Sequence, residues 1–527
     1  MQESIIINTG FRDFARNDSF IGWHFIITFL MATDYILALD QGTSSSRAII
    51  FDRYQQPLGI EQVEFTQHYP SPGWVEHDAE EIWETQIRVA KQLLEKLKIK
   101  PDRIAAIGIA NQRETTVVWD RETGRPIHNA IVWQDRRTAD TCEWLREQGF
   151  ESYIKQTTGL VIDSYFSATK LHWILKNVPG AEKLAQQGRL AFGTIDSWLL
   201  WKLTGGKVHA TDSSNASRTM LLNISTLKWD EKLLKALNIP NSILPEVLPS
   251  SGVFGYTEST VFDGCKIPIT GIAGDQQSAL FGQKCFDPGD AKNTYGTGCF
   301  MLMNTGKKPV NSKSGLLTTV AWQIGDEVTY ALEGSVFIAG AAIKWLRDGL
   351  KIIKSAAETE GIATSIPDSQ GVYVVPAFTG LGAPYWDMYA RGAILGLTQG
   401  VTDKHIVRAT LESLAYQTRD IIGLMEVDSG IKLKSLKADG GASANNFLMQ
   451  FQSDILNSDV VCPPYPEATA LGVALLAGVA IGFYQSNDLI STLPGSKIYN
   501  PKMGAAQSEK LYHYWLKAVE KAKGWAE

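Results

Sequence analysis

Four segments place polar side chains directly after an apolar run, and they hold the residues best suited to do chemistry. They are residues 40–46 (DQGTSSS), 111–114 (NQRE), 274–277 (GDQQ) and 439–444 (DGGASA). The preceding runs are rich in Ile, Leu and Ala, which favours buried strands. In α/β sheets, ligand crevices form at the ends of such strands. A single acid at a strand end is commonly a loop cap, but four complementary ends predict one shared cleft.

The first of these segments lies at the tip of a predicted β-hairpin. Two strand-like runs in residues 36–52 are joined by Gly, Ser and Thr, which favours a tight turn. Small residues let backbone N–H groups approach an anion closely, as in phosphate-binding nests. Asp40 lies at the strand end, where a carboxylate can hold a hydrated Mg²⁺. An ordinary hairpin with a polar tip has the same pattern, so this stretch alone leaves both interpretations open.

The elements that must position these segments alternate between strand-like and helix-like patterns. Strands are predicted at 62–65, 104–110, 115–120, 131–133, 269–273 and 433–438. Helices are predicted at 79–97, 136–148, 167–176, 195–203, 334–346, 402–424, 445–456, 468–480 and 509–523. Asp78 and Glu81 have the spacing of a capping box at the start of the first helix. The alternation predicts an α/β layered fold.

The length of the chain predicts two domains. A chain of 527 residues exceeds what one core supports, which favours domains of roughly 200–250 residues. The turn-rich residues 286–289 (FDPG) are the predicted boundary between domains 31–285 and 286–527. Residues 291–304 then repeat the strand, Gly-Thr loop and strand of the first hairpin. We therefore expect two like-folded lobes that face each other.

The bulk composition is that of a soluble globular protein. Hydrophobic residues make up 44% of the chain and charged residues 20%, and the net charge of -6 comes without a basic stripe. This argues against nucleic acid and anionic membrane as partners. The five cysteines form no CxxC pair and the eight histidines no HExxH spacing. We therefore expect a reducing, cytoplasmic location and no metal site built from Cys or His.

Residues 1–30 are expected to be an N-terminal extension outside the fold. Their apolar run, residues 20–30, is too short to span a bilayer. Arg12 and Arg16 precede this run and leave a signal-peptide interpretation open, but no small-residue cleavage site follows it. Met31 begins MATDYILALDQG, which resembles the start of a cytosolic protein.

Longer motifs give the chain a family resemblance. Two signature stretches are YFSATKLHWILKN, from Tyr165, and GAILGLTQGVTDKHIVRATLE, from Gly392. Further motifs are LALDQGTSSSRA, ANQRETTVVWD, IVWQDRRT, GIAGDQQSALFG, NTYGTGCFML, TGLGAPYWD and DGGASANNF. From about Thr33 to Tyr499 the chain resembles the FGGY carbohydrate-kinase family, and within it is similar to members that phosphorylate glycerol. The resemblance implies an α/β fold of two RNase-H-like (actin-like ATPase) lobes with a central cleft and hinge closure.

The resemblance also implies an activity and its partners. The expected reaction transfers the γ-phosphate of ATP to glycerol and gives sn-glycerol 3-phosphate and ADP. The expected cofactors are ATP and Mg²⁺, and a cytoplasmic homo-oligomer, dimer or tetramer, is expected.

The acceptor site implied by the family combines fixed polar groups with an apolar wall. Its residues here are Arg113, Glu114, Trp133, Tyr165, Asp275, Gln276 and Phe300. Asp275 is the expected catalytic base, which accepts the proton of the terminal hydroxyl. Simpler interpretations are a helix N-cap for Asp275, a surface ion pair for Arg113 and Glu114, and core packing for the aromatic residues.

The nucleotide site implied by the family draws on both halves of the chain. Asp40 is expected to hold Mg²⁺ through water. The expected nucleotide contacts are Thr43, Ser44, Ser45, Arg47, Thr297, Gly340, Lys344, Gly441 and Asn445. Lys344 departs from the family, which often carries Gln there. Lys266 stands in a loop that binds fructose 1,6-bisphosphate in some relatives; because Lys lacks the planar fork of Arg, that regulation is not expected here.

Three other functions remain open at this point. A kinase for another polyol or ketose is disfavoured because a wall of Trp133 and Phe300 leaves limited room for a longer sugar. An actin- or chaperone-like ATPase would share the lobes and hairpins but would not require the NQRE and GDQQ motifs. A catalytically inactive polyol sensor is disfavoured because Asp40 and Asp275 are both present.

Overall fold

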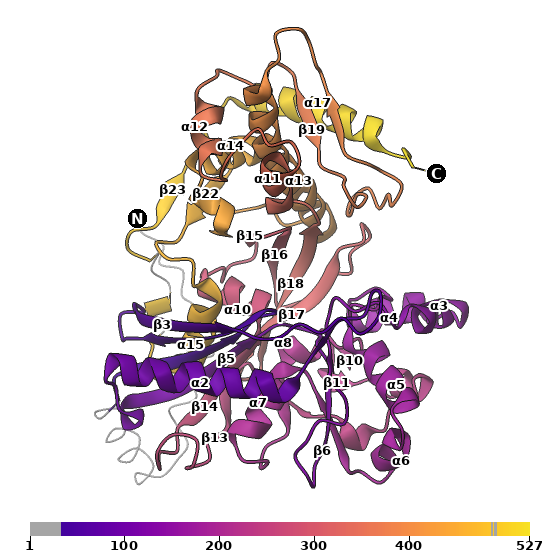
Figure 1. Ribbon diagram of the computed structural model, residues 1–527, viewed down its shortest axis with the longest axis vertical. Helices are drawn as coiled ribbons and strands as arrows, with labels where there is room; N and C mark the ends of the chain where they lie inside the picture. The colour runs from indigo at the N-terminus through magenta and orange to yellow at the C-terminus, as the bar shows by residue number, and fades with distance from the viewer. Residues whose placement is uncertain (1–32, 486–487, 490–492, 527) are drawn as a thin grey trace, which may run out of the picture.

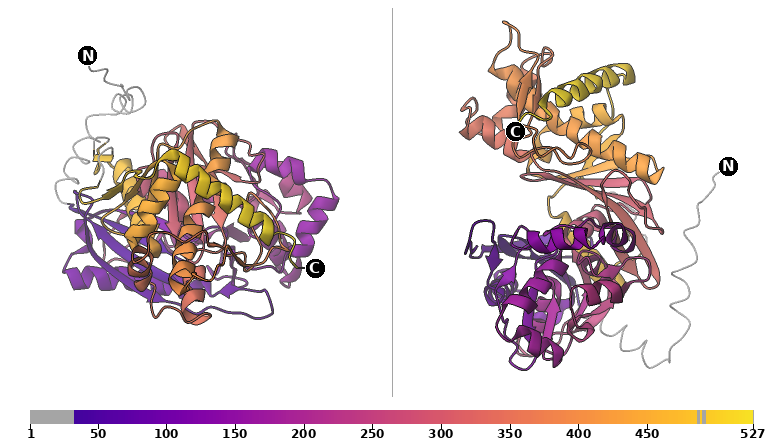
Figure 2. Two further views of the ribbon diagram at one scale, coloured as in Figure 1. Left: turned by 90° about the horizontal axis from the view of Figure 1, so that it is seen from above. Right: turned by 90° about the vertical axis from the view of Figure 1, so that its right-hand side faces the viewer.

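The chain folds into two parts that are stacked along the long axis of the molecule (Figures 1 and 2). The computed structural model describes residues 33–485, 488–489 and 493–526. Elements of the first half of the chain, indigo to magenta, form most of the lower part, and the orange and yellow helices form most of the upper part, while α15 (Ala468–Ala480) lies in the lower part (Figure 1). The predicted extension 1–30 lies outside the described residues. Among the described helices, none is long and apolar enough to cross a membrane.

A mixed sheet of 13 strands runs through both parts. From edge to edge its strands are β23 (Lys497–Tyr499), β22 (Asp459–Cys462), β21 (Ser435–Gly440), β15 (Asp290–Tyr295), β16 (Cys299–Gly306), β18 (Glu327–Val336), β17 (Leu317–Ile324), β13 (Ser251–Tyr256), β14 (Pro268–Gly274), β5 (Ile104–Asn111), β1 (Tyr35–Gln41), β2 (Ser45–Phe51) and β3 (Pro57–Glu64). The strands are joined by turns and by helices on the faces of the sheet, as expected for an α/β fold.

Three parallel neighbours bring three of the four predicted site segments together. β5 lies between β1 and β14 and is parallel to both. Asp40 is in register with Ala110, and Asn111 is in register with both Gln41 and Gly274. The carboxyl ends of the three strands therefore meet at one edge, which brings together the segments 40–46, 111–114 and 274–277. The fourth predicted segment, 439–444, follows β21, which is next to β15 in another part of the sheet, so a cleft shared by all four stays a prediction.

The two glycine-containing hairpins are built alike. β1 pairs antiparallel with β2 and parallel with β5, and β15 pairs antiparallel with β16 and parallel with β21. The parallel neighbour ends beside each hairpin, with Asn111 next to Gln41 and Gly440 next to Tyr295. The expected duplication of this arrangement is therefore present.

Helices of the first half agree in part with the predicted ranges. They are α2 (Ala79–Leu97), α3 (Ala139–Glu147), α4 (Glu151–Thr158), α5 (Ser167–Asn177), α6 (Ala181–Gln186), α7 (Ile195–Leu203), α8 (Ser213–Ala216), α9 (Glu231–Ala236) and α10 (Asp275–Gly282). Four of them, α2, α3, α5 and α7, agree closely with the predicted ranges, and the shorter helices α4, α6, α8 and α9 were not predicted. Asp78 caps α2 by accepting a hydrogen bond from the backbone N–H of Glu80 at 2.8 Å. The carboxylate of Glu81 accepts hydrogen bonds from Thr66, so the predicted capping box is not formed.

Short two-stranded sheets accompany these helices. Their strands are β4 (Glu76–His77), β6 (Val117–Asp120), β7 (Ala130–Ile131), β8 (Leu190–Gly193), β9 (Ala210–Asp212), β10 (Leu222–Asn223), β11 (Lys228–Trp229) and β12 (Glu246–Leu248), with β19 (Tyr373–Val375) and β20 (Ala393–Leu395) in the second half.

Several helices of the second half differ in their bounds from the predicted ranges, most at the start of the helix predicted at 334–346. The helices of this half are α11 (Gly340–Asp348), α12 (Glu358–Thr364), α13 (Asp403–Ser429), α14 (Asn446–Leu456), α15 (Ala468–Ala480) and α17 (Ala505–Ala522). The helix predicted at 334–346 begins only at Gly340, because the chain up to Val336 belongs to β18. β18 pairs with β16 on one side and β17 on the other, and this tertiary pairing outweighs the local helical pattern.

α15 crosses back from the second half of the chain to the first. It packs against α10 and against β1, β5 and β14. The approach to α10 is so close that a Cβ at Gly472 would lie 1.8 Å from the carbonyl oxygen of Ser278. This explains the Ala- and Gly-rich composition of the helix. The predicted domain boundary after residue 285 falls between α10 and β15 and stays a prediction.

Candidate active site

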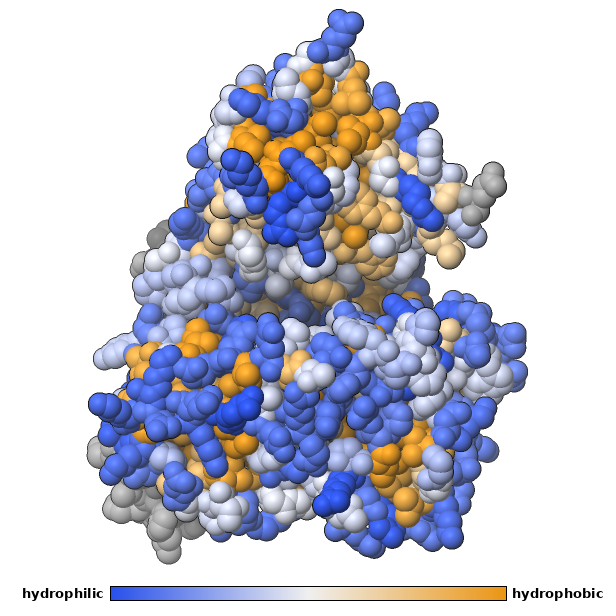
Figure 3. Space-filling model, viewed as in Figure 1, coloured by the Kyte–Doolittle hydropathy of each residue, from blue (hydrophilic) through white to orange (hydrophobic). Residues whose placement is uncertain are grey.

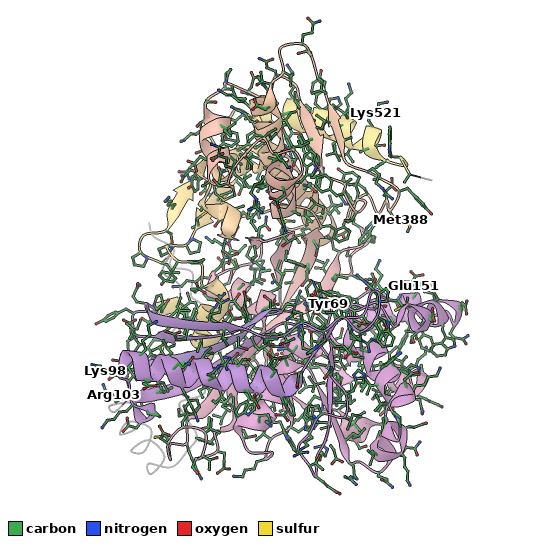
Figure 4. All side chains as sticks on the ribbon, in the orientation of Figure 1. Tyr69, Lys98, Arg103, Glu151, Met388 and Lys521 are labelled. Atoms are coloured by element: carbon green, nitrogen blue, oxygen red, sulfur yellow. The ribbon has the colours of Figure 1, made fainter. Side chains whose placement is uncertain are left out.

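The surface of the molecule is hollowed between its upper and lower parts (Figure 3). Two exposed side chains lie on either side of this hollow, Tyr69 below and Met388 above (Figure 4). They are 69% and 71% exposed. β16, β17 and β18 run between the two parts, so residues from both parts of the fold can meet here (Figure 1).

Asp275 begins α10 directly after β14. The side chain is 30% exposed, and its Oδ1 lies 3.3 Å from Nε of Arg113. The same oxygen accepts a hydrogen bond from the backbone N–H of Gln276 at 2.7 Å. Gly274, not Asp275, is the N-cap of α10, so the helix-cap interpretation of Asp275 is wrong. A Cβ at Gly274 would lie 2.8 Å from Cγ and Cδ of Arg113, so only glycine admits this arrangement without displacing the arginine.

Arg113 and Glu114 belong to a buried ion-pair quartet with Arg218 and Glu333. Both terminal nitrogens of Arg113 donate to Glu333, at 2.5 and 3.0 Å. Arg218 donates from Nη2 to Glu333 at 3.0 Å and from Nε to Glu114 at 2.7 Å. The four residues are at most 3% exposed. The surface ion-pair interpretation of Arg113 and Glu114 is therefore wrong.

The two carboxylates of the quartet differ in their electrostatics. Burial alone would raise the pKa of Glu333, but the charges of Arg113 and Arg218 outweigh it and lower the pKa to about 2. Burial raises the pKa of Glu114, and the same two guanidinium groups offset this only in part. Glu333 is thus the permanently ionised partner that balances two buried cations.

Glu114 also has an unusual backbone. Its φ angle is 61°, in the left-handed region that residues other than glycine rarely adopt. Such residues persist only where the surroundings hold them, and they cluster at functional sites. The ion pair to Arg218 supplies such a constraint. Sequence reasoning missed Arg218 and Glu333, because ion pairs between residues more than 100 positions apart leave no local pattern.

Trp133 and Tyr165 form an aromatic wall beside Arg113. Their rings meet edge to face with centroids 5.5 Å apart. Nη2 of Arg113 donates to the Tyr165 hydroxyl at 3.3 Å, and Nε1 of Trp133 donates to Oγ1 of Thr43 at 3.0 Å. Phe300 is half-buried on β16, and within the described residues it makes no ring contact with Trp133 or Tyr165. The wall was predicted as Trp133 with Phe300, but in the described residues the ring that contacts Trp133 is that of Tyr165, which was predicted only to supply a hydroxyl.

Asp40 lies at the end of β1 and is 9% exposed. Burial raises its pKa to about 6, against the charge of Arg47 and with a contribution from Asp275. Nη1 of Arg47 lies 3.6 Å from Oδ2 of Asp40 and donates to Glu467 at 2.8 Å. The cation predicted to contact phosphate is therefore paired with Glu467, a residue that sequence reasoning missed.

Lys292 is a second residue that sequence reasoning missed. It is fully buried on β15, where it donates to Oε1 of Gln276 and to Oγ1 of Thr294, the latter at 3.0 Å. Burial lowers its pKa to about 8. Asp439 is in register with Thr294, and its buried Oδ1 has no hydrogen-bond partner in the described residues. No clear signal for it is present in the sequence, because the strand that carries Lys292 (DAKNTY) is mostly polar although it is mostly buried.

The remaining predicted nucleotide contacts lie on turns and helix starts of both hairpins. The β1–β2 turn carries Thr43 and Ser44, and Ser45 begins β2. Thr297 lies in the β15–β16 turn, and its carbonyl oxygen accepts the N–H of Ala341 at 3.1 Å. Gly340 begins α11 and donates to Gly296 at 3.0 Å. These contacts bring the second hairpin and α11 together.

Gly441, Asn445 and Lys344 complete the predicted set. Gly441 is exposed and begins the 3-10 helix Gly441–Ala444 that follows β21. Asn445 caps α14 by accepting from Leu448 and donates to Thr359 at 3.1 Å. Lys344 is exposed on α11. The functional roles of all these residues stay predictions.

The donor groups fit a hydrated Mg²⁺ better than a metal held by the protein alone. In the described part of the chain, no three or more His, Cys, Asp or Glu side chains are arranged to hold an ion. Mg²⁺ characteristically keeps several waters and takes one or two carboxylates together with substrate phosphates. The carboxylate of Asp40 beside the glycine-containing turn provides this kind of donor.

Comparisons with known proteins agree with this geometry. The N-terminal domain of the FGGY family of carbohydrate kinases matches residues 35–282, and its C-terminal domain matches residues 291–481. A glycerol kinase of Carboxydothermus hydrogenoformans is 62% identical over 496 residues, which cover 94% of this chain and 99% of the relative.

Solved structures show the same fold. A crystal structure of Plasmodium falciparum glycerol kinase with ADP has a TM-score of 0.88 at 39% identity and covers 93% of this chain and 98% of that chain. A xylulose kinase of Lactobacillus acidophilus has a TM-score of 0.83 at 23% identity, covering 92% and 98%. The two-lobed, actin-like ATPase fold expected from the sequence is confirmed, and the chain belongs to the FGGY family of carbohydrate kinases.

Proposed function

We propose that the protein is an ATP-dependent glycerol kinase, which transfers the γ-phosphate of ATP to glycerol and releases sn-glycerol 3-phosphate and ADP. The main support is the arrangement of Asp275, Arg113 and the Trp133–Tyr165 wall at adjoining strand ends. The names of relatives about 62% identical over 94% of the chain agree with it.

Glycerol binds with its carbon chain against Trp133 and its hydroxyls toward the polar groups. Nε of Arg113 donates to one hydroxyl. Oε2 of Glu114 accepts from another, since the other oxygen of this carboxylate is already bonded to Arg218. Gln276, held by Lys292, and Phe300 complete the site. Because most of these donors already have fixed partners, little reorganisation is needed when glycerol binds.

The transfer step uses Asp275 as the general base. Its carboxylate takes the proton of the terminal hydroxyl while that oxygen forms a bond to the γ-phosphorus. The bond between the γ-phosphorus and the bridging oxygen breaks, and ADP leaves with that electron pair. Such proton transfer contributes on the order of 10²–10⁴-fold, and alignment with charge neutralisation supplies the rest.

The phosphates lie between the two hairpins. Thr43, Ser44 and Thr297 donate to phosphate oxygens, and Arg47 does so once it is released from Glu467. Asp40 would hold a hydrated Mg²⁺ through water, and such an ion would supply positive charge against the charge of the phosphates. Gly441 and Asn445 contact the adenosine, with Gly340 and Lys344 nearby.

We also infer a cytoplasmic homo-oligomer. All five cysteines are unpaired thiols, which suits a reducing compartment. The acidic surface offers no basic stripe for nucleic acid. Size-exclusion chromatography with light scattering measures the oligomeric state directly.

Product identification tests the activity. The purified chain is incubated with Mg²⁺, ATP and, separately, glycerol, dihydroxyacetone, xylulose and gluconate. The proposal expects glycerol to have the highest kcat/KM and to yield glycerol 3-phosphate. A higher kcat/KM on a ketose or gluconate indicates another kinase of the family. ATP hydrolysis that is independent of glycerol and yields no phosphorylated product indicates an actin-like ATPase.

A further inference from the structure

The ion-pair quartet of Arg113, Glu114, Arg218 and Glu333 joins distant parts of the chain at the acceptor site. Arg113 and Glu114 follow β5, Arg218 follows α8, and Glu333 lies in the middle of β18. Glu333 is in register with Leu302 on β16, the strand that also carries Phe300. The position of Arg113 is therefore tied to a strand of the second half of the chain.

Three carboxylates compete for Arg113. Glu333 takes both terminal nitrogens in a bidentate pair, at 2.5 and 3.0 Å. Asp275 lies 3.3 Å from Nε, and Oε1 of Glu114 lies 3.8 Å from the same atom. Bidentate pairing is the strongest arrangement of arginine and carboxylate. Glu333 thus leaves Asp275 with a single, longer contact to the guanidinium group.

Arg218 holds the carboxylate of Glu333, and Glu333 in turn holds Arg113. It bridges Glu333 and Glu114 from Nη2 and Nε, and it is completely buried. Because both glutamates are also buried, removing one charge would leave an uncompensated arginine in a site from which water is excluded. The nearest carboxylate that such an Arg113 can pair with is Asp275.

We propose that Glu333, anchored by Arg218, is a positioning residue that keeps Arg113 from forming a bidentate pair with Asp275. Asp275 is thereby left with an oxygen for the terminal hydroxyl, and Arg113 is left with Nε for the substrate. This inference rests on the proposed function, in which Asp275 is the base for phosphorylation of glycerol.

The first test is Glu333→Gln, which keeps the shape of the side chain and removes its charge. We expect kcat on glycerol to fall on the order of 10–100-fold in folded protein, with a smaller change in the Kd of glycerol measured by calorimetry. Glu333→Asp keeps the charge and is expected to recover much of this loss. Glu327→Gln is the matched control, since Glu327 lies on the same strand in an exposed pair with Lys307 and is expected to leave kcat unchanged.

A double-mutant cycle separates positioning from a merely structural role. If Glu333 acts by restraining Arg113, then Glu333→Gln lowers kcat much less in an Arg113→Met background than in the wild type. An equal loss in both backgrounds, or no loss in the wild type, overturns the inference.

Two further measurements keep the test decisive. If Glu333→Gln does not fold, the same cycle is made with Arg218→Lys, which keeps a charge but cannot bridge both glutamates in the planar geometry of Arg. Failure of the wild type to phosphorylate glycerol overturns the proposed function. If the wild type phosphorylates glycerol and the effects of the two substitutions on kcat are additive, only the proposed role of Glu333 is overturned.

Discussion

The acceptor side of the site and its nucleotide side hold their polar groups in different ways. On the acceptor side, Arg113 and Glu114 are at most 3% exposed and are bonded into the quartet. On the predicted nucleotide side, Ser44 and Thr297 are exposed on turns, and Gly441 is exposed at the start of a 3-10 helix. The predicted acceptor residues are held by bonds within the protein, while the predicted nucleotide residues leave backbone and hydroxyl groups exposed.

From this difference we expect the acceptor side to determine substrate specificity and the nucleotide side to rearrange when ATP binds. A rigid, buried array discriminates among small acceptors because a misplaced hydroxyl leaves a buried group unpaired. Exposed glycine-containing turns tolerate the rearrangement that accompanies closure on a nucleotide. Substitutions on the acceptor side should therefore change KM for glycerol, and substitutions on the nucleotide side should change KM for ATP.

The largest expected effect comes from Asp275→Asn. The variant keeps the hydrogen bond from the Gln276 N–H but cannot accept the proton, so we expect kcat to fall at least about 100-fold. Glycerol binding, measured by calorimetry, and the melting temperature should change little. Asp287→Asn, in an exposed pair with Lys434, is the control. Near-normal turnover of Asp275→Asn would show that another group accepts the proton.

Gly274→Ala tests the rigidity of the acceptor side. The new methyl group would lie 2.8 Å from Arg113, so the guanidinium group must move. We expect KM for glycerol to rise about tenfold and KM for ATP to stay within about twofold. Gly361→Ala is the matched control, because no heavy atom lies within 4 Å of its Cβ position. A larger effect on ATP than on glycerol would contradict the division between the two sides.

Lys292 gives a pH dependence that links the two sides. Burial lowers its pKa to about 8, so the ammonium group is charged below that pH and loses its proton above it. Since the charged form donates to Gln276, we expect kcat/KM for glycerol to decline as the pH rises through about 8. Lys292→Arg keeps its charge and should move this decline to higher pH. An unchanged basic limb in that variant would assign the decline to another group.

The smallest expected effect is that of Lys344→Gln on the nucleotide side. Lys344 is exposed on α11, and an exposed charge contributes little. We expect KM for ATP to change by less than about fivefold and KM for glycerol not at all. Steady-state kinetics with each substrate varied in turn measure both values. A change above tenfold would show that the contact with ATP is a strong one.

The parts of the fold that were predictable from sequence are those with local signals. α7 and α15 were predicted at their observed bounds because their apolar runs end at clear turn residues. The strand ends at Asp40 and Asp275 followed from polar residues placed after buried runs. The start of the helix predicted at 334–346 was wrong, because pairing with two neighbouring strands decides the structure of residues up to Val336. The helices predicted at 402–424 and 509–523 also differ in their bounds from α13 and α17.

The parts of the site that were not predictable depend on long-range contacts. Glu333, Arg218 and Glu467 have roles only because distant segments meet in the fold. The positive φ of Glu114 and the close approach of Gly274 to Arg113 are likewise properties of the folded chain. The residue type at one position does not reveal which charged residue, far away in the sequence, will be buried beside it.

The crossing of α15 has a consequence for how the protein is made. Residues 468–480 cover β1, β5 and β14, which are translated several hundred residues earlier. During synthesis, the apolar face of those strands is not covered by α15 until residues 468–480, near the end of the chain, have been translated. The amino-terminal half should therefore need a chaperone during synthesis, and expressed as a fragment it should aggregate unless a peptide containing residues 468–480 is supplied.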